Sequence, residues 1–196
     1  NSAFDMIAIS FTDGRASDEI ILGEETYCEK SAAPYKDTTY RTDIKPFKMS
    51  KYMVSYNTWY YVYQWAIKNG YKFINKGCEG MYTSGNNAGV YYKFNEGGVP
   101  KVEEMPATGM SWRDTIIWCN ALSQMLGLQP VYCSDAAFTT PLKDSTQSTT
   151  QFADKNWDKT PGKIDNPYVN PKANGYRLPY TAEWEYAARK KPDGTC

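Results

Sequence analysis

Residues 174–189 constrain the fold of this chain more than any other segment. They read Asn-Gly-Tyr-Arg-Leu-Pro-Tyr-Thr-Ala-Glu-Trp-Glu-Tyr-Ala-Ala-Arg and predict a loop that enters a helix, because Pro179 stops the preceding element and an amphipathic stretch follows. Trp184, Ala187 and Ala188 fall at positions i, i+3 and i+4 and form one apolar stripe. This spacing predicts that the stripe builds core and takes no part in chemistry.

Two longer amphipathic segments precede this one. A helix is predicted through about Asn69, capped by Ser55 or Asn57 and ended by Gly70. Its apolar stripe is Trp59, Val62, Tyr63 and Ala66. A second helix is predicted to start at a capping box of Ser111 and Asp114 and to end at Gly127. Its apolar face is Trp112, Ile116, Cys119, Leu122 and Leu126. Since neither helix is stable alone, we expect both to pack on a sheet or on another helix.

The remaining segments predict short strands and long loops. Strands are expected around residues 6–11, 19–23 and 47–51, and residues 24–45 are expected to form a loop. A hairpin is expected within residues 71–105, with turn residues at 84–89 and a strand at 90–94. Residues 134–174 are predicted to be a polar surface excursion with at most one short hairpin. We expect the indoles of Trp59, Trp112 and Trp184 to close over a common sheet.

Composition excludes several classes of function. Lys plus Arg and Asp plus Glu each number 22, so no net field recruits nucleic acid or an anionic membrane surface. No apolar stretch approaches about 18 residues, so the sequence predicts no transmembrane segment. Histidine is absent, which removes the usual general base and every histidine-based metal site.

The cysteines show no metal-ligand spacing. They are Cys28, Cys78, Cys119, Cys133 and Cys196. Cys119 lies on an apolar helix face and is most simply a small buried hydrophobe. Disulfides among Cys28, Cys78 and Cys133 are compatible with their loop-like contexts but do not follow from the sequence.

The segment 174–189 resembles the signature of the formylglycine-generating enzyme (sulfatase-modifying factor) family. Residues 47–57 (FKMSKYMVSYN) and the block from Met105 that contains TGMSWRD resemble two further family blocks in the same order. In the family pattern a threonine caps the last helix, but Tyr180 stands at that position here. Either Thr181 caps the helix one residue late, or the cap is lost.

The resemblance implies an α+β fold of C-type-lectin type, with two main helices on a small antiparallel sheet and much irregular loop. It also implies that residues 1–196 form a single domain of this family, as its N-terminal portion, with residues 134–174 as a polar loop insertion.

Three constellations are candidate sites. Asp154, Asn156, Asp158 and Asp165 have the oxygen spacing of a calcium loop, but Lys159 stands where the turn needs glycine, so a solvated loop is the favoured reading. Tyr82, Tyr91 and Tyr92 lie in a Gly- and Asn-rich context typical of recognition surfaces, although tyrosines that brace long loops would look the same. Glu183 and Glu185 near Arg177 suggest ion pairing or capping more than acid–base catalysis.

The leading hypothesis is a non-catalytic ligand-binding or display scaffold of the kind found among variable proteins of diversity-generating retroelements. Its binding face would lie mostly beyond residue 196, its partner would be a protein or surface ligand, and it would be exported or at the cell surface. The alternative is a formylglycine-generating oxidase that uses copper and a cysteine pair in the C-terminal half, and no cysteine here is assigned to that pair. A carbohydrate-binding module is a third option, by analogy of fold alone. No catalytic residue is assigned, and calcium is the one cofactor that the residues themselves suggest.

Overall fold

The computed structural model describes residues 5–11, 16–22, 40–83, 91–102, 105–146 and 158–189. The chain divides into two compact units. Unit 1 comprises residues 1–51 and 179–196, and unit 2 comprises residues 52–178. Both combine helices with small antiparallel sheets, so the chain is an α+β protein, as predicted.

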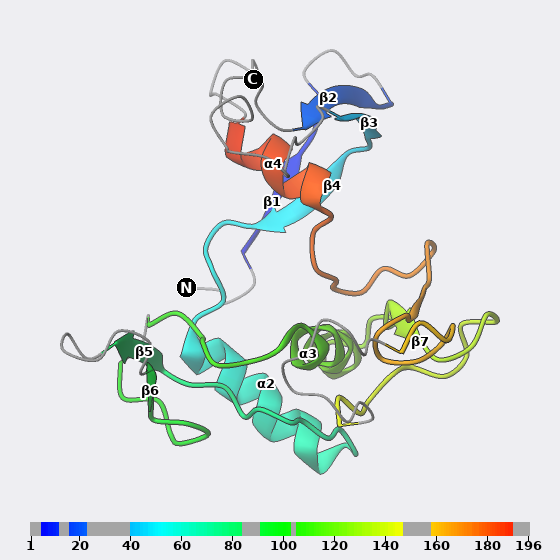
Figure 1. The fold of residues 1–196 in the computed structure, drawn as a ribbon. Helices are drawn as coiled ribbons and strands as arrows, with labels where there is room; N and C mark the ends of the chain where they lie inside the picture. The colour runs from blue at the N-terminus through cyan, green and yellow to red at the C-terminus, as the bar shows by residue number, and fades with distance from the viewer. Residues whose placement is uncertain are drawn as a thin grey trace, which may run out of the picture. The chain divides into compact units, whose positions relative to one another are not determined.

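The described residues of unit 1 form two strand pairs and one helix (Figure 1). Strand β1 (Met6–Ile9) pairs with β4 (Phe47–Ser50), and β2 (Asp18–Leu22) pairs with β3 (Tyr40–Ile44). Strand β3 lies within the segment 24–45, for which the sequence predicted a loop. That prediction is wrong for β3 because its polar residues show none of the apolar alternation that indicates a strand. Helix α4 (Thr181–Arg189) contacts β2 and β3.

The face of α4 that is buried in the core of unit 1 is not the face that the sequence predicted. Tyr186 is buried with Phe11 and Ile44, and its ring meets that of Phe11 edge to face at 5.9 Å. The Tyr186 hydroxyl donates to Asp18 Oδ2 at 3.0 Å. Trp184 is 61% exposed, so the prediction that its stripe builds core is wrong for these residues. Aromatic residues lie on two faces of this helix, and only the tertiary partner decides between them.

The start of α4 keeps half of a capping box. The carbonyl of Tyr180 accepts from Trp184 N at 2.9 Å, which makes Tyr180 the N-cap residue. Glu183 at the third helical position accepts from Tyr180 N at 2.9 Å. The hydroxyl half of the box is missing because tyrosine cannot reach the helix N–H groups as threonine does. Thr181 is the first helical residue and does not replace the cap.

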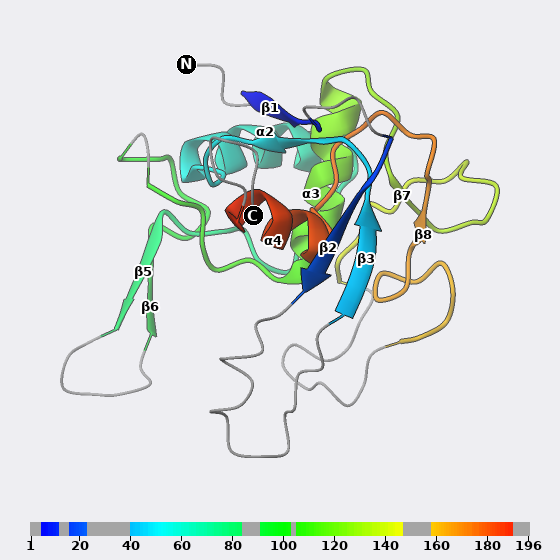
Figure 2. The ribbon, with the colours of Figure 1, turned by 90° about the horizontal axis from the view of Figure 1, so that it is seen from above.

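Unit 2 is built on two helices that pack side by side, α2 (Tyr56–Lys68) and α3 (Trp112–Met125) (Figures 1 and 2). Their predicted caps are confirmed: Ser55 caps α2, and Ser111 with Asp114 forms the capping box of α3. The indoles of Trp59 and Trp118 stack between the helices with their centroids 5.3 Å apart. Trp118 Nε1 also donates to the carbonyl of Trp59 at 3.1 Å, so packing and hydrogen bonding fix the same pair.

The buried stripes match the prediction for α2 and only partly for α3. The four residues of the predicted α2 stripe, Trp59, Val62, Tyr63 and Ala66, are all buried. In α3, Ile116, Cys119 and Leu122 are buried, but Trp112 is 41% exposed and Leu126 is also exposed. Trp118 supplies the core indole in place of Trp112. The strands of the described residues form four separate two-stranded sheets, so the expectation that three indoles close over a common sheet is wrong.

Two further strand pairs complete unit 2. Strands β5 (Gly80–Thr83) and β6 (Tyr91–Phe94) form the predicted hairpin, which Figure 2 shows as a narrow ribbon, and its turn lies outside the described residues. Strand β7 (Tyr132–Cys133) pairs with β8 (Tyr168–Val169). The segment predicted to run over the surface contributes buried side chains: Leu142, Ser145 and Ile164.

Candidate functional site: loops held by buried carboxylates

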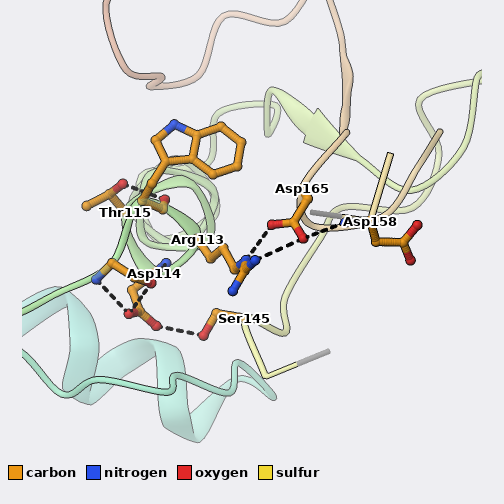
Figure 3. A network of polar contacts seen from close by, with 8 residues as sticks. Arg113, Asp114, Thr115, Ser145, Asp158 and Asp165 are labelled. Atoms are coloured by element: carbon orange, nitrogen blue, oxygen red, sulfur yellow. Dashed lines mark hydrogen bonds and ion pairs between the residues drawn. The ribbon is translucent and has the colours of Figure 1, made fainter. Parts of the chain in front are cut away.

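Asp114 is the centre of a buried polar network at the start of α3 (Figure 3). Within its own turn it accepts from Ser111 N at 2.9 Å and from Ser111 Oγ at 2.7 Å. From outside the helix it accepts from Ile74 N at 3.1 Å, Asn75 Nδ2 at 2.8 Å and Ser145 Oγ at 2.6 Å. The carboxylate therefore fastens two distant loops to one helix terminus, where the helix dipole also favours a negative charge.

Arg113, next to Asp114, holds a third loop. Its guanidinium forms a bidentate ion pair with Asp165, in which Nη2 lies 3.0 Å from Oδ2 and Nε contacts Oδ1 (Figure 3). Asp165 is buried and also accepts from Asp158 N at 3.1 Å. A buried carboxylate in this position is stable because paired donors replace the water that it loses.

Glu79 is a third buried carboxylate that holds a loop, in this case the one that follows the β5–β6 hairpin. It is buried, and its carboxylate accepts from the backbone N–H groups of Lys101 and Val102. Asn95 Nδ2 donates to it at 2.7 Å. Burial alone would raise the pKa of Glu79, but these hydrogen bonds and the charge of Lys101 outweigh burial and lower it. The loop 95–102 is therefore anchored from below by an ionised side chain.

The first half of segment 174–189 forms a latch, defined here as residues 174–178, on the end of α3. Tyr176 N donates to Ser123 Oγ at 2.8 Å, and Leu178 N donates to Tyr132 Oη at 3.0 Å. Gly175 runs so close to α3 that a Cβ there would stand 2.5 Å from Ser123 Oγ. Glycine is therefore needed at this position for close approach of the backbone.

The described thiols are buried and poorly suited to nucleophilic chemistry. Burial raises the pKa of Cys119 to about 12. Burial, and then the charge of Asp135, raises the pKa of Cys133. Cys119 and Cys133 are free thiols, and Cys78 is fully buried. Since the thiolate is the reactive form, a raised pKa disfavours Cys119 and Cys133 as nucleophiles at neutral pH. The prediction that Cys119 is a buried hydrophobe is confirmed.

The structure places the predicted site residues as follows. Asp154 and Asn156 lie outside the described residues, whereas Asp158 and Asp165 belong to the Arg113 network described above. The carboxylate of Asp158 accepts from Thr160 N at 3.0 Å. Within the described part of the chain, no three His, Cys, Asp or Glu side chains cluster in a way that could hold a metal ion. The calcium loop therefore stays a prediction.

The backbones of the predicted recognition tyrosines meet in the hairpin. Tyr82 pairs with Tyr92, and Tyr91 pairs with Thr83. Of the two predicted acidic residues on α4, Glu183 caps the helix and Glu185 pairs with Arg189 Nη1 at 2.7 Å. The structure thus shows capping and ion pairing, the roles favoured from the sequence, for Glu183 and Glu185.

Sequence reasoning missed the anchoring carboxylates Glu79 and Asp165 in this role. Glu79 follows a cysteine in a loop, and its partners lie 16 to 23 residues away. Arg113 and Asp165 are 52 residues apart. The one available signal was local: the S-x-x-D pattern of Ser111 and Asp114, which predicted the cap but not the loops that Asp114 also holds.

Several exposed apolar side chains form a second candidate feature, a surface on unit 2. This surface is called the apolar patch and consists of Met53, Val54, Phe94, Val102 and Met105. Two of its parts, the residues before α2 and Met105, lie close together, because Tyr56 N donates to Met105 O at 2.7 Å and Ala107 N donates to Val54 O at 3.0 Å. Met105 Cγ lies 3.7 Å from where a Cβ on Gly80 would be, and Gly80 is the register partner of Phe94.

These observations define a class: an α+β domain in which buried carboxylates hold long loops on a two-helix core. Residues 12–195 match the sulfatase-modifying factor enzyme 1-like domain. The chain belongs to this family, and the α+β fold of C-type-lectin type that the family resemblance implied is confirmed.

Two known proteins are similar to the chain. The chain is 28% identical over 172 residues to the chaperone protein LppX of Paenibacillus barcinonensis, a match that covers 88% of this chain and 45% of that protein. The crystal structure of CarF matches with a TM-score of 0.60 at 24% identity, over 97% of this chain and 58% of that one, and shows the fold alone. The chain thus spans about half the length of the relatives that it matches. Within the described residues, no helix is long and apolar enough to cross a membrane.

Proposed function

We propose that this domain is a non-catalytic scaffold that binds other polypeptides through its surface loops. The observation that carries the proposal is that the buried carboxylates among the described residues accept hydrogen bonds that hold the structure together. Asp114, Glu79 and Asp165 each accept several hydrogen bonds that fix loops, and Glu183 accepts from the start of its own helix. Carboxylates occupied in this way position loops and are poorly placed for proton transfer.

The other ionisable groups support the same reading. The chain has no histidine, and burial raises the pKa of both Cys119 and Cys133, which disfavours the thiolate near neutral pH. Exposed tyrosine, methionine and valine side chains, by contrast, are plentiful on unit 2. One relative carries the name of a chaperone, which favours a polypeptide as the ligand.

The formylglycine-generating oxidase remains the second candidate, because the matched family is defined on an enzyme. In that case a copper-binding cysteine pair outside residues 1–196 would supply the chemistry. The finer hypothesis of a retroelement variable protein, and the expectation of an exported or cell-surface location, rest on the family resemblance. Labelling of intact cells with a membrane-impermeant biotin reagent would test the location.

One experiment separates scaffold from enzyme. The intact protein is incubated with copper, oxygen, an added thiol as the source of the two further electrons that reduce oxygen to water, and a cysteine-containing sulfatase peptide, and an aldehyde-reactive hydrazide probe detects any formylglycine. In parallel, binding of a reduced and carboxymethylated test protein, which stays unfolded, is followed by fluorescence anisotropy. We expect saturable binding of the unfolded protein and no aldehyde. Aldehyde formation that requires copper would instead establish the oxidase.

A further inference from the structure

We propose that Asn69 is a site of spontaneous modification, at which the side-chain amide is converted to a carboxylate, and that the fold protects Asn174 from the same reaction. This inference does not depend on the proposed function. It starts from a tripeptide that occurs twice: Asn-Gly-Tyr stands at residues 69–71 and again at 174–176. Asparagine is a chemically labile residue, and a following glycine hinders the reaction least because it has no Cβ. Since the reacting residues are the same in both copies, a difference between them has to come from the structure.

The reaction needs the chain and water and involves no oxidant or reductant. The backbone nitrogen of the glycine attacks Cγ of the asparagine, so that a new C–N bond closes a succinimide ring. Nδ2 leaves as ammonia, with the proton that the glycine nitrogen gives up. Water then opens the ring at one of its two carbonyls and leaves either aspartate or isoaspartate. The attack requires rotation about ψ of the asparagine, so the freedom of the following peptide controls the rate.

Gly70 has room for this rotation. It follows Asn69, the C-cap residue of α2, and a Cβ built on it would meet no atom within 4 Å. Gly70 lies between the end of α2 and the buried Tyr71, so it can absorb the movement with little change on either side. The rotation gives up the hydrogen bond that the carbonyl of Asn69 accepts from Lys143 Nζ at 3.3 Å. That bond lies at the surface, where a long lysine side chain can follow the backbone.

Gly175 has no such room, because the latch holds it. A Cβ there would stand 2.3 Å from Gln129 O and 2.5 Å from Ser123 Oγ. Asn174 Oδ1 accepts from Gln129 N at 2.9 Å, and Tyr176 N donates to Ser123 Oγ at 2.8 Å. Asn69 and Asn174 are both exposed, so access of water does not separate the two sites. The reaction at Asn174 requires the latch to open, and its rate therefore falls with the population of the opened state.

The two amides also differ in what their conversion to a carboxylate would do. Asn69 uses its nitrogen: Nδ2 donates to Trp65 O at 2.8 Å in the last turn of α2. A carboxylate cannot donate this bond, and it brings a negative charge to the end of the helix where the dipole disfavours one. Asn174 uses its oxygen to accept from Gln129 N, and a carboxylate keeps that bond. The site that is free to react is thus also the site where the reaction weakens the structure.

The test incubates the intact protein in mildly alkaline buffer made with water that carries heavy oxygen, in parallel with and without denaturant. Peptide mapping by mass spectrometry then measures the acid formed at each site. The oxygen label separates reaction during the incubation from reaction during digestion, and isoaspartate in the product shows that the ring formed. Two variants accompany the unchanged protein. Gly70→Ala adds the missing Cβ at the open site, and Ser123→Ala removes the hydroxyl against which Gly175 packs. Circular dichroism melts confirm that both are folded.

We expect Asn69 to react at least about tenfold faster than Asn174 in the folded protein, and the two rates to agree within about threefold in denaturant, where the latch is absent. Ser123→Ala should speed the reaction at Asn174 and leave that at Asn69 unchanged. Gly70→Ala should slow the reaction at Asn69 alone. In thermal melts, Asn69→Asp should lower the midpoint more than Asn174→Asp does.

Equal rates at the two sites of the folded protein would overturn the inference, because the latch would then give no protection. It would also be overturned if neither site reacted in the folded protein while both reacted in denaturant, since Gly70 would then be held as firmly as Gly175. If Asn174→Asp lowered the melting midpoint as much as Asn69→Asp, the proposed effect of the modification on α2 would be wrong.

Discussion

The two halves of segment 174–189 differ in how they are held. The latch, residues 174–178, belongs to unit 2 and is fixed by a close backbone approach at Gly175 and by hydrogen bonds to Ser123 and Tyr132. The helix that follows belongs to unit 1, keeps only half of its cap and exposes Trp184. One continuous sequence motif therefore performs two separate structural tasks, and its tightest constraint lies in the loop and not in the helix.

Within segment 174–189, the largest effect is expected at the latch. Gly175→Ala places a Cβ against Ser123 Oγ and the carbonyl of Gln129, both of which are held by their surroundings. We expect the free energy of unfolding to fall by about 2 to 3 kcal/mol, as for other overpacked sites. Denaturant unfolding of the intact protein measures this change.

Gly80→Ala is the matched control for that prediction. A Cβ at Gly80 would stand 3.7 Å from Met105 Cγ, an ordinary contact distance. This variant should stay within about 0.5 kcal/mol of the unchanged protein, because the added methyl group meets no fixed atom. If both alanine variants lost the same stability, the tight approach at Gly175 would not be the reason for glycine there.

A smaller loss is expected at the helix. Glu183→Ala removes the remaining half of the capping box and should cost about 1 kcal/mol. Glu185→Ala, two residues along, breaks the ion pair with Arg189 at the helix surface and should cost at most about 0.5 kcal/mol. Thermal melts of the two variants compare them directly. An equal effect of both would mean that Glu183 acts through surface charge and not as a cap.

The sequence predicted those features of the fold that depend on neighbouring residues. The caps at Ser55, Ser111 and Asp114 and the glycine that ends each long helix follow from local hydrogen bonding, so a short window of sequence contains the necessary information. The same is true of the α2 stripe, whose four predicted residues lie at helical spacing on one face and are all buried.

The features that it missed depend on distant partners. Trp112 and Trp118 both lie on α3, and the stacking partner Trp59, 59 residues before Trp118, selects the second. Asp165 is a buried anchor only because Arg113 lies opposite it. Periodicity gives the possible faces of a helix but not the element that covers one of them, so the anchoring network could not be predicted from spacing alone.

The contribution of Glu79, in unit 2, to the free energy of unfolding is expected to depend on pH. Hydrogen bonds hold the folded pKa of Glu79 below its ordinary value of 4.5, so its ionised form stabilises the fold at neutral pH. That contribution is complete above about pH 4.5, the unfolded pKa, and is lost as the pH falls through the lower folded pKa. Glu79→Gln should therefore be less stable than the unchanged protein at pH 7, and the difference should shrink on acidification. A gap that stays constant from pH 7 to pH 3 would contradict this role.

The smallest effect is expected at Trp184, and it bears most directly on the comparison. Trp184→Ser should change the free energy of unfolding by no more than about 0.5 kcal/mol, because the indole is largely exposed. Trp59→Ala, in the stacked pair of unit 2, should lose about 3 to 5 kcal/mol by contrast. A loss above about 2 kcal/mol for Trp184→Ser would mean that another part of the intact protein covers this face. The apolar stripe of α4 would then be interior after all, and the helix would be as firmly held as the latch.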